Sequence, residues 1–249
     1  MSNHDAIPAD RSGDSLDWSY APPPTVYDLV RDSLAIKFTR FAIHSITHPF
    51  IRLYNRLHVI DRENVLNNWP CVITPNHSSH MDTVAVFASL PLSYVNRIFA
   101  LAAKDYFFRN SAITLAARLI ANVIPLDRTG AEKTGLHICL SKQREGNSIL
   151  MFPEGTRSAT GDMGLFKKGA IMLSREAKIP IIPTYIQGAL ASMPKATNFP
   201  RPVEITVVYG ERLCYWEPPL DTLEHQPAAQ HLEQRVKALK RKLEEMLSK

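Results

Sequence analysis

The chain has 249 residues, a formal net charge of +5 and three cysteines. This length accommodates one substantial α/β domain with appendages but not a second independent core. Cys71, Cys139 and Cys214 have neither paired nor metal-ligand spacing, which argues against a disulfide framework and favours a reducing compartment. The basic charge suits anionic surfaces or phosphorylated ligands, whereas nucleic-acid binding is disfavoured because no recognition motif accompanies the charge.

Residues 1–24 are predicted to form a disordered tail. They carry four aspartates against Arg11, so the tail contributes −3 to the net +5 and the remainder contributes +8. The run Pro22–Pro24 closes this polar segment, which lacks the basic start and apolar centre of a signal peptide. We interpret the tail as a linker or docking arm.

Residues 25–58 are expected to form an amphipathic helical segment, broken into two parts at Pro49. Aromatic and aliphatic residues recur at helical spacing between Arg and Lys, yet no stretch reaches the ~18 uninterrupted apolar residues of a spanning helix. The helix either lies in a membrane interface or packs on the domain. His44 and His48 lie four residues apart without a third ligand, so we expect surface or interface histidines.

Residues 70–74 are predicted to form a buried strand that leads through a turn into a helix capped by Ser78 or Ser79. His77 then lies in the turn and Asp82 in the first helical turns. On one continuous helix, residues five apart point about 140° away from each other, so contact between them requires this change of state. The Asp82 carboxylate can accept the ring N–H of His77 and leave the other nitrogen free to take a proton. The alternative is a polar turn that only caps itself.

From residue 98 to residue 209, short apolar runs alternate with windows of helical periodicity. The predicted strands are 98–101, 123–124, 149–152, 181–186 and 203–209, and the predicted helices are 105–120, 131–145 and 169–178. This alternation predicts a single α/β domain with a central mixed sheet flanked by helices. Gly146 and Pro180 are placed to end two of these helices.

The segment Phe152–Ser158 follows an apolar strand, at the position where open α/β sheets bind ligands. Gly155 permits close backbone approach, Thr156 offers a hydroxyl, and Arg157 offers a planar set of donors suited to phosphate. The alternative is an ordinary turn with solvated charges.

Residues 216–249 are predicted to form a linker and an amphipathic helix. Apolar residues follow each other at steps of three and four, with basic residues around them: Leu232, Val236, Leu239, Leu243 and Met246. Docking on the domain is the default expectation, and a second membrane contact is the alternative.

Together these patterns resemble the glycerolipid acyltransferase family that includes bacterial 1-acylglycerol-3-phosphate acyltransferases. Four family blocks occur in order: His77 with Asp82 five residues later, residues 122–128, residues 152–158 and the Pro-rich strand 179–183. The second block keeps its Arg but lacks the family's aromatic residue, and Ala103-Lys104 precedes an aromatic residue as in the family. The resemblance covers about residues 60–210. It implies an acyltransferase domain at 59–215 and favours a membrane interface for 25–58.

The resemblance implies transfer of a fatty acyl group from acyl-CoA or acyl carrier protein to a lysophospholipid hydroxyl, above all that of 1-acylglycerol 3-phosphate, giving phosphatidic acid. The thioester donor is already activated, so no cofactor or metal is implied. A membrane-associated location at the cytoplasmic face is expected. The implied catalytic residues are His77 and Asp82, and the implied substrate-binding residues are Lys104, Arg128, Glu154, Gly155, Thr156 and Arg157.

Three other functions stay open. The chain could acylate another lysolipid, or bind lysolipid without turnover, which the altered second block permits. It could also be a metal-dependent hydrolase, if His77, His80 and Asp82 converged on a cation.

Overall fold

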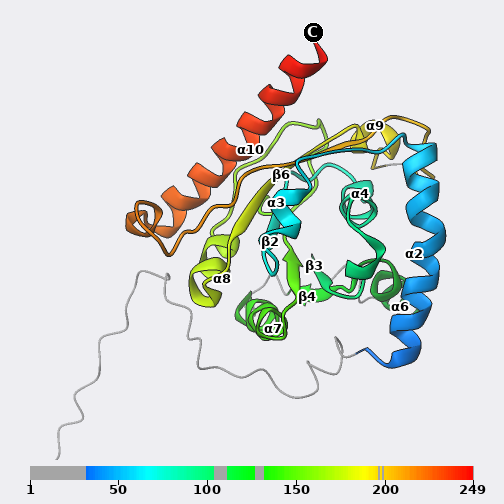
Figure 1. Cartoon of the computed structure of the whole chain (residues 1–249), viewed down its shortest axis with the longest axis horizontal. Helices are drawn as coiled ribbons and strands as arrows, with labels where there is room; N and C mark the ends of the chain where they lie inside the picture. Colours follow the sequence, from blue (N-terminus) through cyan, green and yellow to red (C-terminus); the bar gives the residue numbers. More distant parts are fainter. Residues whose placement is uncertain (1–31, 104–110, 127–131, 196, 198, 249) are drawn as a thin grey trace, which may run out of the picture.

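The computed structural model describes residues 32–103, 111–126, 132–195, 197 and 199–248 (Figure 1). The described strands form one seven-stranded sheet in the order β1-β7-β6-β2-β5-β3-β4. Strands β2 to β6 are mutually parallel, whereas β7 pairs antiparallel with β6 and parallel with β1. The predicted mixed sheet is therefore confirmed. The strands are β1 (His58–Ile60), β2 (Val72–Pro75), β3 (Ile98–Ala103), β4 (Ile124–Leu126), β5 (Ser148–Leu150), β6 (Ile181–Gln187) and β7 (Thr206–Tyr209).

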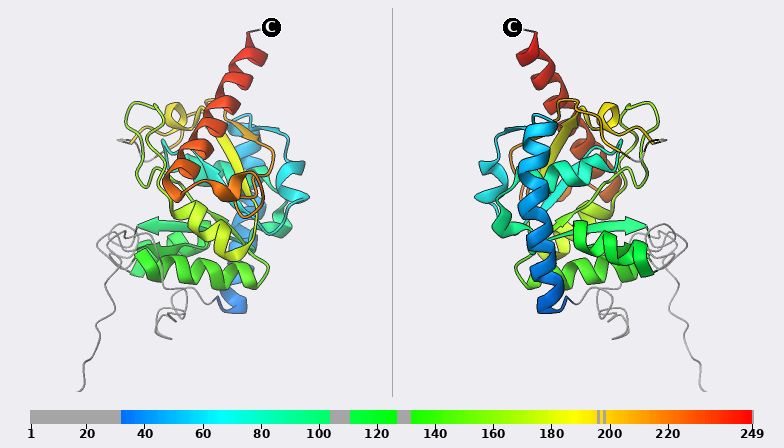
Figure 2. Two further views of the ribbon diagram at one scale, coloured as in Figure 1. Left: turned by 90° about the vertical axis from the view of Figure 1, so that its left-hand side faces the viewer. Right: turned by 90° about the vertical axis from the view of Figure 1, so that its right-hand side faces the viewer.

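Helices cover both faces of the sheet, as predicted. One face packs against α2 (Leu34–Tyr54), α4 (Met81–Ser89) and α6 (Ser111–Ala121). The other face packs against α7 (Glu132–Arg144), α8 (Gly169–Ala177) and α10 (His225–Leu247). The two views of Figure 2 place α10 and α2 on opposite sides of the molecule. The short helices are α3 (Glu63–Leu66), η1 (Leu92–Tyr94), α9 (Ala189–Ser192) and η2 (Leu220–Thr222).

The central strands are buried on both faces. Val72 of β2 belongs to the hydrophobic cluster on the α7, α8 and α10 side, and its neighbour Ile73 belongs to the cluster on the α2, α4 and α6 side. Ile181 and Ile182 of β6 divide between the clusters in the same way. Successive strand residues point to opposite faces, so a continuous apolar run can serve two helix layers. The sheet therefore forms a packed support for the loops at its carboxyl edge.

Helix α2 is continuous across Pro49, so the predicted break at this residue is wrong. Pro49 lacks the N–H that would bond to the carbonyl of Ser45. Both residues lie on the exposed side of the helix, whereas the neighbouring His48 and Ile51 are buried against the domain. Contacts on the inner side therefore hold the helix together. The described part of α2 covers only a portion of the predicted segment 25–58, since residues 25–31 and the tail 1–24 lie outside the described residues.

The expectation that His44 and His48 are surface or interface histidines is also wrong, because both are buried. His44 Nε2 lies 3.0 Å from the carbonyl oxygen of Ile120, and His48 Nε2 lies 3.1 Å from His44 Nδ1. The His44 ring also stacks on Phe87 of α4. Within the described residues, no helix combines the length and hydropathy needed to cross a membrane.

Helix α10 docks on the domain as the sequence predicts. Leu232, Val236 and Leu243 are buried in the cluster on the α8 side of the sheet. The buried Cys71 and Cys139 also lie in the hydrophobic clusters, and burial raises the pKa of the Cys71 thiol to about 12. Cys71 is therefore a core residue, as expected from its place in the predicted buried strand 70–74.

Candidate active site

The motif formed by His77 and Asp82 and the motif at residues 152–158 meet at the carboxyl edge of the sheet. His77 follows β2, and the segment that contains Glu154 follows β5. Strands β2 and β5 are parallel neighbours, with Val72 opposite Ile149 and Ile73 opposite Leu150. Loops that leave the same edge of adjacent parallel strands are brought together by the sheet.

His77 and Asp82 are in contact, as predicted. His77 Nδ1 lies 3.0 Å from Asp82 Oδ2, and the imidazole keeps 16% of its surface exposed while the carboxylate is fully buried. The ring therefore presents its second nitrogen, Nε2, as the atom available to a reactant. A buried carboxylate on Nδ1 fixes the tautomer in which Nε2 can accept a proton.

The Asp82 carboxylate is itself held by the backbone. Its Oδ2 accepts the N–H groups of Ser78 at 2.6 Å and Ser79 at 2.8 Å. Helix α4 begins at Met81, and the Ser79 hydroxyl accepts the Met81 N–H at 3.1 Å. The predicted serine cap is thus present only in part, because the carboxylate takes the amides of the turn. These bonds fix the carboxylate before any substrate binds.

The ring of His77 also stacks on Phe152, with centroids 3.8 Å apart and an interplanar angle of 21°. Phe152 is the first residue of the motif at 152–158, so the imidazole ring of His77 is held by the loop after β2 and by the loop after β5. Only its place in the motif marks Phe152 as a candidate site residue, because an aromatic residue after a strand is otherwise expected to lie in the core.

Glu154 links three segments of backbone. Its Oε1 accepts the N–H of His77 at 2.7 Å, and its Oε2 accepts the N–H of Gly164 at 2.8 Å. In return, the N–H of Ser158 donates to the His77 carbonyl at 2.9 Å. Burial raises the pKa of Glu154, an effect that the two N–H donors oppose. The carboxylate therefore sets the position of the loop that carries His77, a role that the sequence did not specify.

The other predicted substrate-binding residues lie in different surroundings. Gly155 has φ of +72°, a conformation that favours glycine, and a Cβ atom there would lie 2.9 Å from Lys167 Nζ. Thr156 is exposed, and Arg157 is half-buried close enough to His80 for its charge to act on that ring. The predicted phosphate ligands Lys104 and Arg128 lie outside the described residues.

His80 is a half-buried neighbour of the site. Burial is the main cause that lowers its pKa to about 4, and the charges of Arg157 and His77 add to this effect. In the part of the chain that the structure describes, no three His, Cys, Asp or Glu side chains are arranged to hold a metal ion. His77, His80 and Asp82 therefore do not form the cation site that the hydrolase hypothesis requires.

A model of the acyltransferase family matches residues 56–187, which is more than half of the chain. The chain belongs to the acyltransferase family. The match contains both motifs and all of the site geometry described above from His77 to Gly164.

Curated members of this family are similar to the chain over its central part. A chloroplastic 1-acyl-sn-glycerol-3-phosphate acyltransferase of Brassica napus is 33% identical over 52% of this chain and 36% of its own length. A 1-acyl-sn-glycerol-3-phosphate acyltransferase of Chlamydomonas reinhardtii is 30% identical over 71% of this chain and 54% of its own length. The chain thus spans between about a third and about half of these relatives.

A solved structure supports the same fold. The crystal structure of the 1-acyl-sn-glycerophosphate acyltransferase PlsC from Thermotoga maritima has a TM-score of 0.64 and 21% identity, covering 90% of this chain and 88% of that one. The similarity in fold therefore extends beyond residues 56–187, the part of the chain that the family model matches.

Proposed function

We propose that this protein transfers a fatty acyl group from a thioester donor, acyl-CoA or acyl carrier protein, to a hydroxyl of 1-acylglycerol 3-phosphate, which gives phosphatidic acid. The observation that carries the proposal is the pair formed by His77 and Asp82, with Nδ1 bound to a buried carboxylate and Nε2 left for the substrate. The relatives from Brassica napus and Chlamydomonas reinhardtii are named 1-acyl-sn-glycerol-3-phosphate acyltransferases, which is the same reaction.

In the proposed reaction, Nε2 of His77 accepts the proton of the acceptor hydroxyl while the oxygen attacks the thioester carbonyl carbon. The C–S bond then breaks, and the thiolate takes the proton from the imidazolium. The buried carboxylate of Asp82 stabilises the imidazolium between these steps. The thioester is already activated, so we expect no cofactor besides the donor.

Arg157 is the proposed ligand of the acceptor phosphate, with Lys104 and Arg128 as further candidates. It follows Glu154 by three residues in the loop that Glu154 ties to His77. This connection would keep the distance between the phosphate and the reacting base constant. Gly155 and Thr156 would line the same pocket. A planar guanidinium also matches two phosphate oxygens at once.

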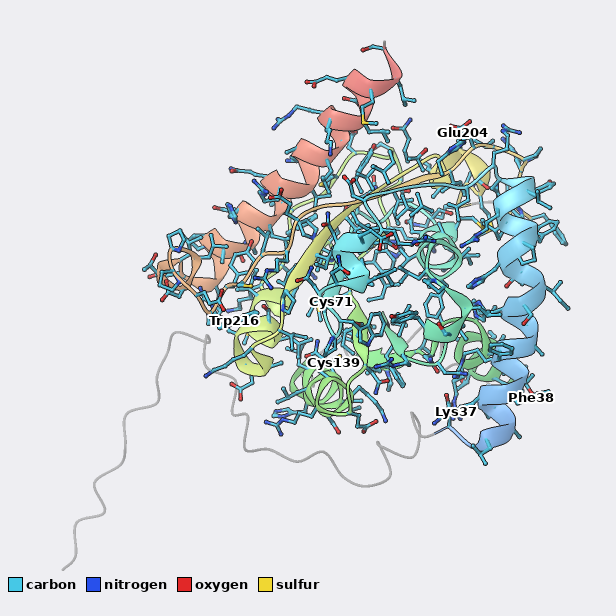
Figure 3. The ribbon with its side chains drawn as sticks, viewed as in Figure 1. Lys37, Phe38, Cys71, Cys139, Glu204 and Trp216 are labelled. Carbon is cyan, nitrogen blue, oxygen red and sulfur yellow. The ribbon has the colours of Figure 1, made fainter. Side chains whose placement is uncertain are left out.

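We further propose that α2 binds a membrane surface at the cytoplasmic face, where the lipid acceptor resides. The side of α2 that faces away from the domain is apolar, and Phe38 projects outward in Figure 3. The exposed fractions are 85% for Leu34, 74% for Phe38 and 80% for Leu53. Inserting such side chains below the lipid headgroups removes them from water, and Lys37 and Arg52 add exposed positive charge.

The test is thiol release from acyl-CoA and from acyl carrier protein by purified protein in detergent, with a panel of lysolipids. We expect release that depends on 1-acylglycerol 3-phosphate and that falls about 10²- to 10⁴-fold in His77→Ala, the range for loss of a general base. Circular dichroism of the variant checks that the fold is retained.

The other outcomes identify the competing functions. Release that depends on a different lysolipid would reassign the acceptor. Release without any acceptor would indicate thioester hydrolysis, and lysolipid binding without turnover would indicate a binding protein. A folded His77→Ala variant with near-normal rates would contradict the mechanism.

A further inference from the structure

A cavity of about 350 Å³ lies next to the candidate site, between α10 and the loop that continues from Arg157. Asn76, the residue before His77, forms part of its lining, and Tyr185 of β6 forms another part. The loop contributes residues 161–163. The cavity therefore extends from the surface of the C-terminal helix to Asn76, the residue that precedes His77 in the chain.

The α10 side of the cavity is a basic stripe. Lys237, Lys240, Arg241 and Glu244 follow each other at steps of three, one and three residues, so they share one side of the helix. The rotation of the helix is fixed because Leu232, Val236 and Leu243 are buried on its other side.

The charges of the lining leave a cationic excess. Three basic side chains from α10 face two acids, Asp162 and Glu244. Lys237 Nζ lies 2.6 Å from Glu233 Oε1, whose other oxygen accepts the N–H of Phe166, so this lysine is fixed and partly neutralised. Lys240 lies 3.8 Å from Glu244, and among the described residues Arg241 has no ion-pair partner. Lys240 and Arg241 are thus the cations best placed for an anionic ligand.

Tyr185 and Asn76 give the inner part of the cavity a neutral lining. Burial, followed by the charge of Glu244, raises the pKa of Tyr185 to about 12, so the phenol is a neutral group at pH 7. The amide of Asn76 is occupied, since it donates to the Ile186 carbonyl and accepts the Ile186 N–H. The inner part therefore suits an uncharged chain, and the outer part suits an anion.

We infer that this cavity binds the phosphopantetheine arm of the acyl donor, with the arm's phosphate at Lys240 and Arg241. The inference rests on the proposed function, which brings two anionic substrates to one histidine. Arg157 does not line the cavity, so the acceptor phosphate and the donor phosphate have separate cations and do not compete. The arm is common to CoA and acyl carrier protein, so the site does not select between them by this chemistry.

The experiment compares Lys240→Gln/Arg241→Gln with the unmodified protein, using acyl-CoA, acyl-phosphopantetheine and acyl-pantetheine as donors. Removing the half-buried Lys240 and the exposed Arg241 should raise KM for the two phosphorylated donors about tenfold, because ion contacts near the surface each contribute modestly to binding. We expect little change in kcat, in KM for the lysolipid, or in the rate with acyl-pantetheine, which lacks the phosphate.

Lys242→Gln is the matched control. Lys242 belongs to the same helix but pairs with Asp61 at 3.1 Å and does not line the cavity. This variant removes one positive charge from α10, against two in the double variant, and leaves the cavity intact, so it should leave every KM unchanged if the cavity is the cause. Equal effects of the control and the cavity variants would overturn the inference.

Three results would contradict the assignment: unchanged KM for acyl-CoA, a raised KM for the lysolipid, or an equal loss with acyl-pantetheine. Acyl carrier protein is assayed as a fourth donor, and a loss with it but not with acyl-CoA would also overturn the assignment, because the helix would then recognise the carrier's protein surface. If the unmodified protein is inactive with every donor, the proposed function fails instead. Calorimetric binding of CoA then tests the cavity alone, with weaker binding by the double variant as support and equal binding as refutation.

Discussion

Helices α2 and α10 have similar sequence patterns but pack in opposite ways. In α10, the apolar residues Leu232 and Val236 are buried and the basic stripe is exposed. In α2, the polar residues Arg40 and His48 are buried, and most of the apolar residues are exposed, with Ile51 as the buried exception. Periodicity therefore shows that a helix has two sides, but it does not show which side meets the core.

The buried polar side of α2 is stabilised by specific partners. Arg40 donates to the Asp32 carboxylate at 2.6 Å, to the Asn96 side chain, and through Nε and Nη2 to the Arg118 carbonyl. Arg118 in turn donates to the other oxygen of Asp32 at 2.9 Å. Such a network can replace apolar contact only if each buried charge is paired.

The largest expected effect is that of Arg40→Ala on folding stability. The substitution leaves the Asp32 carboxylate with only Arg118 in a nearly buried place, and breaking a buried pair costs about 3–5 kcal/mol. Arg241→Ala on α10 is the control, since that side chain is exposed and should change stability by less than about 0.5 kcal/mol. Urea denaturation measures both. Similar midpoints for the two variants would show that α2 is not held by this network.

The next largest difference in stability is expected between alanine substitutions of one leucine on α10 and one leucine on α2. Leu232→Ala on α10 removes a fully buried side chain and should cost about 2–4 kcal/mol in the free energy of unfolding. Leu53→Ala on α2 removes a side chain that is 80% exposed and should stay within about 0.5 kcal/mol in detergent-free buffer. A large loss in Leu53→Ala would mean that the outer side of α2 is covered in solution.

The histidines on the two helices should differ in their pH dependence. Burial lowers the pKa of His48 to about 4, below the ordinary value of 6.5. Between these values the unfolded chain binds a proton that the folded chain does not, so stability falls by about 2 kcal/mol as pH drops from 6.5 to 4. The control is His48→Gln, which keeps a hydrogen-bonding group next to His44 and does not titrate.

A second histidine titrates in the same pH range as His48. Burial also lowers the pKa of His80 to about 4, but His80 is present in both the wild type and His48→Gln, so the difference between their stability profiles reports on His48. On α10, burial also lowers the pKa of His231, but this side chain is only half-buried, so His231→Gln should change the profile less. Equal profiles for all three proteins would show that His48 is not buried in solution.

The smallest expected effect concerns membrane binding. Phe38→Ser should lower the affinity for anionic lipid vesicles about tenfold, since burial of a phenylalanine contributes roughly 1.5–3 kcal/mol. Co-sedimentation with the vesicles measures this affinity. Met246→Ser removes an exposed apolar side chain from α10 and should have no effect if only α2 meets the lipid. Equal losses in both variants would extend the membrane contact to α10, and no loss in either would contradict it for α2.

Much of the fold could be predicted because strand and helix periods are local properties. The alternation from Ile98 to Tyr209 identified the described strands in this range and the helices α6, α7 and α8, but it missed the short helix α9. The contact of His77 with Asp82 was also predictable, because the turn that holds His77 leads directly into the first turn of the helix that holds Asp82.

Other features depend on residues that are distant in sequence. Glu154 holds the N–H of His77 across 77 positions, and the arrangement depends on the adjacency of β2 and β5. The continuity of α2 at Pro49 likewise depends on contacts with α4 and α6, which no local pattern records.

The class of fold, the pairing of a base with a carboxylate and the presence of two-sided helices follow from the amino-acid sequence alone, because each depends on neighbours within a few residues. Tertiary contacts, by contrast, set which side of each helix is buried: α2 buries Arg40 and exposes Phe38, and the basic side of α10 lines a cavity that reaches Asn76. The physical reason is that the orientation of a helix is set by whichever side finds partners, and Asp32, Asn96 and the Arg118 carbonyl are those partners for α2.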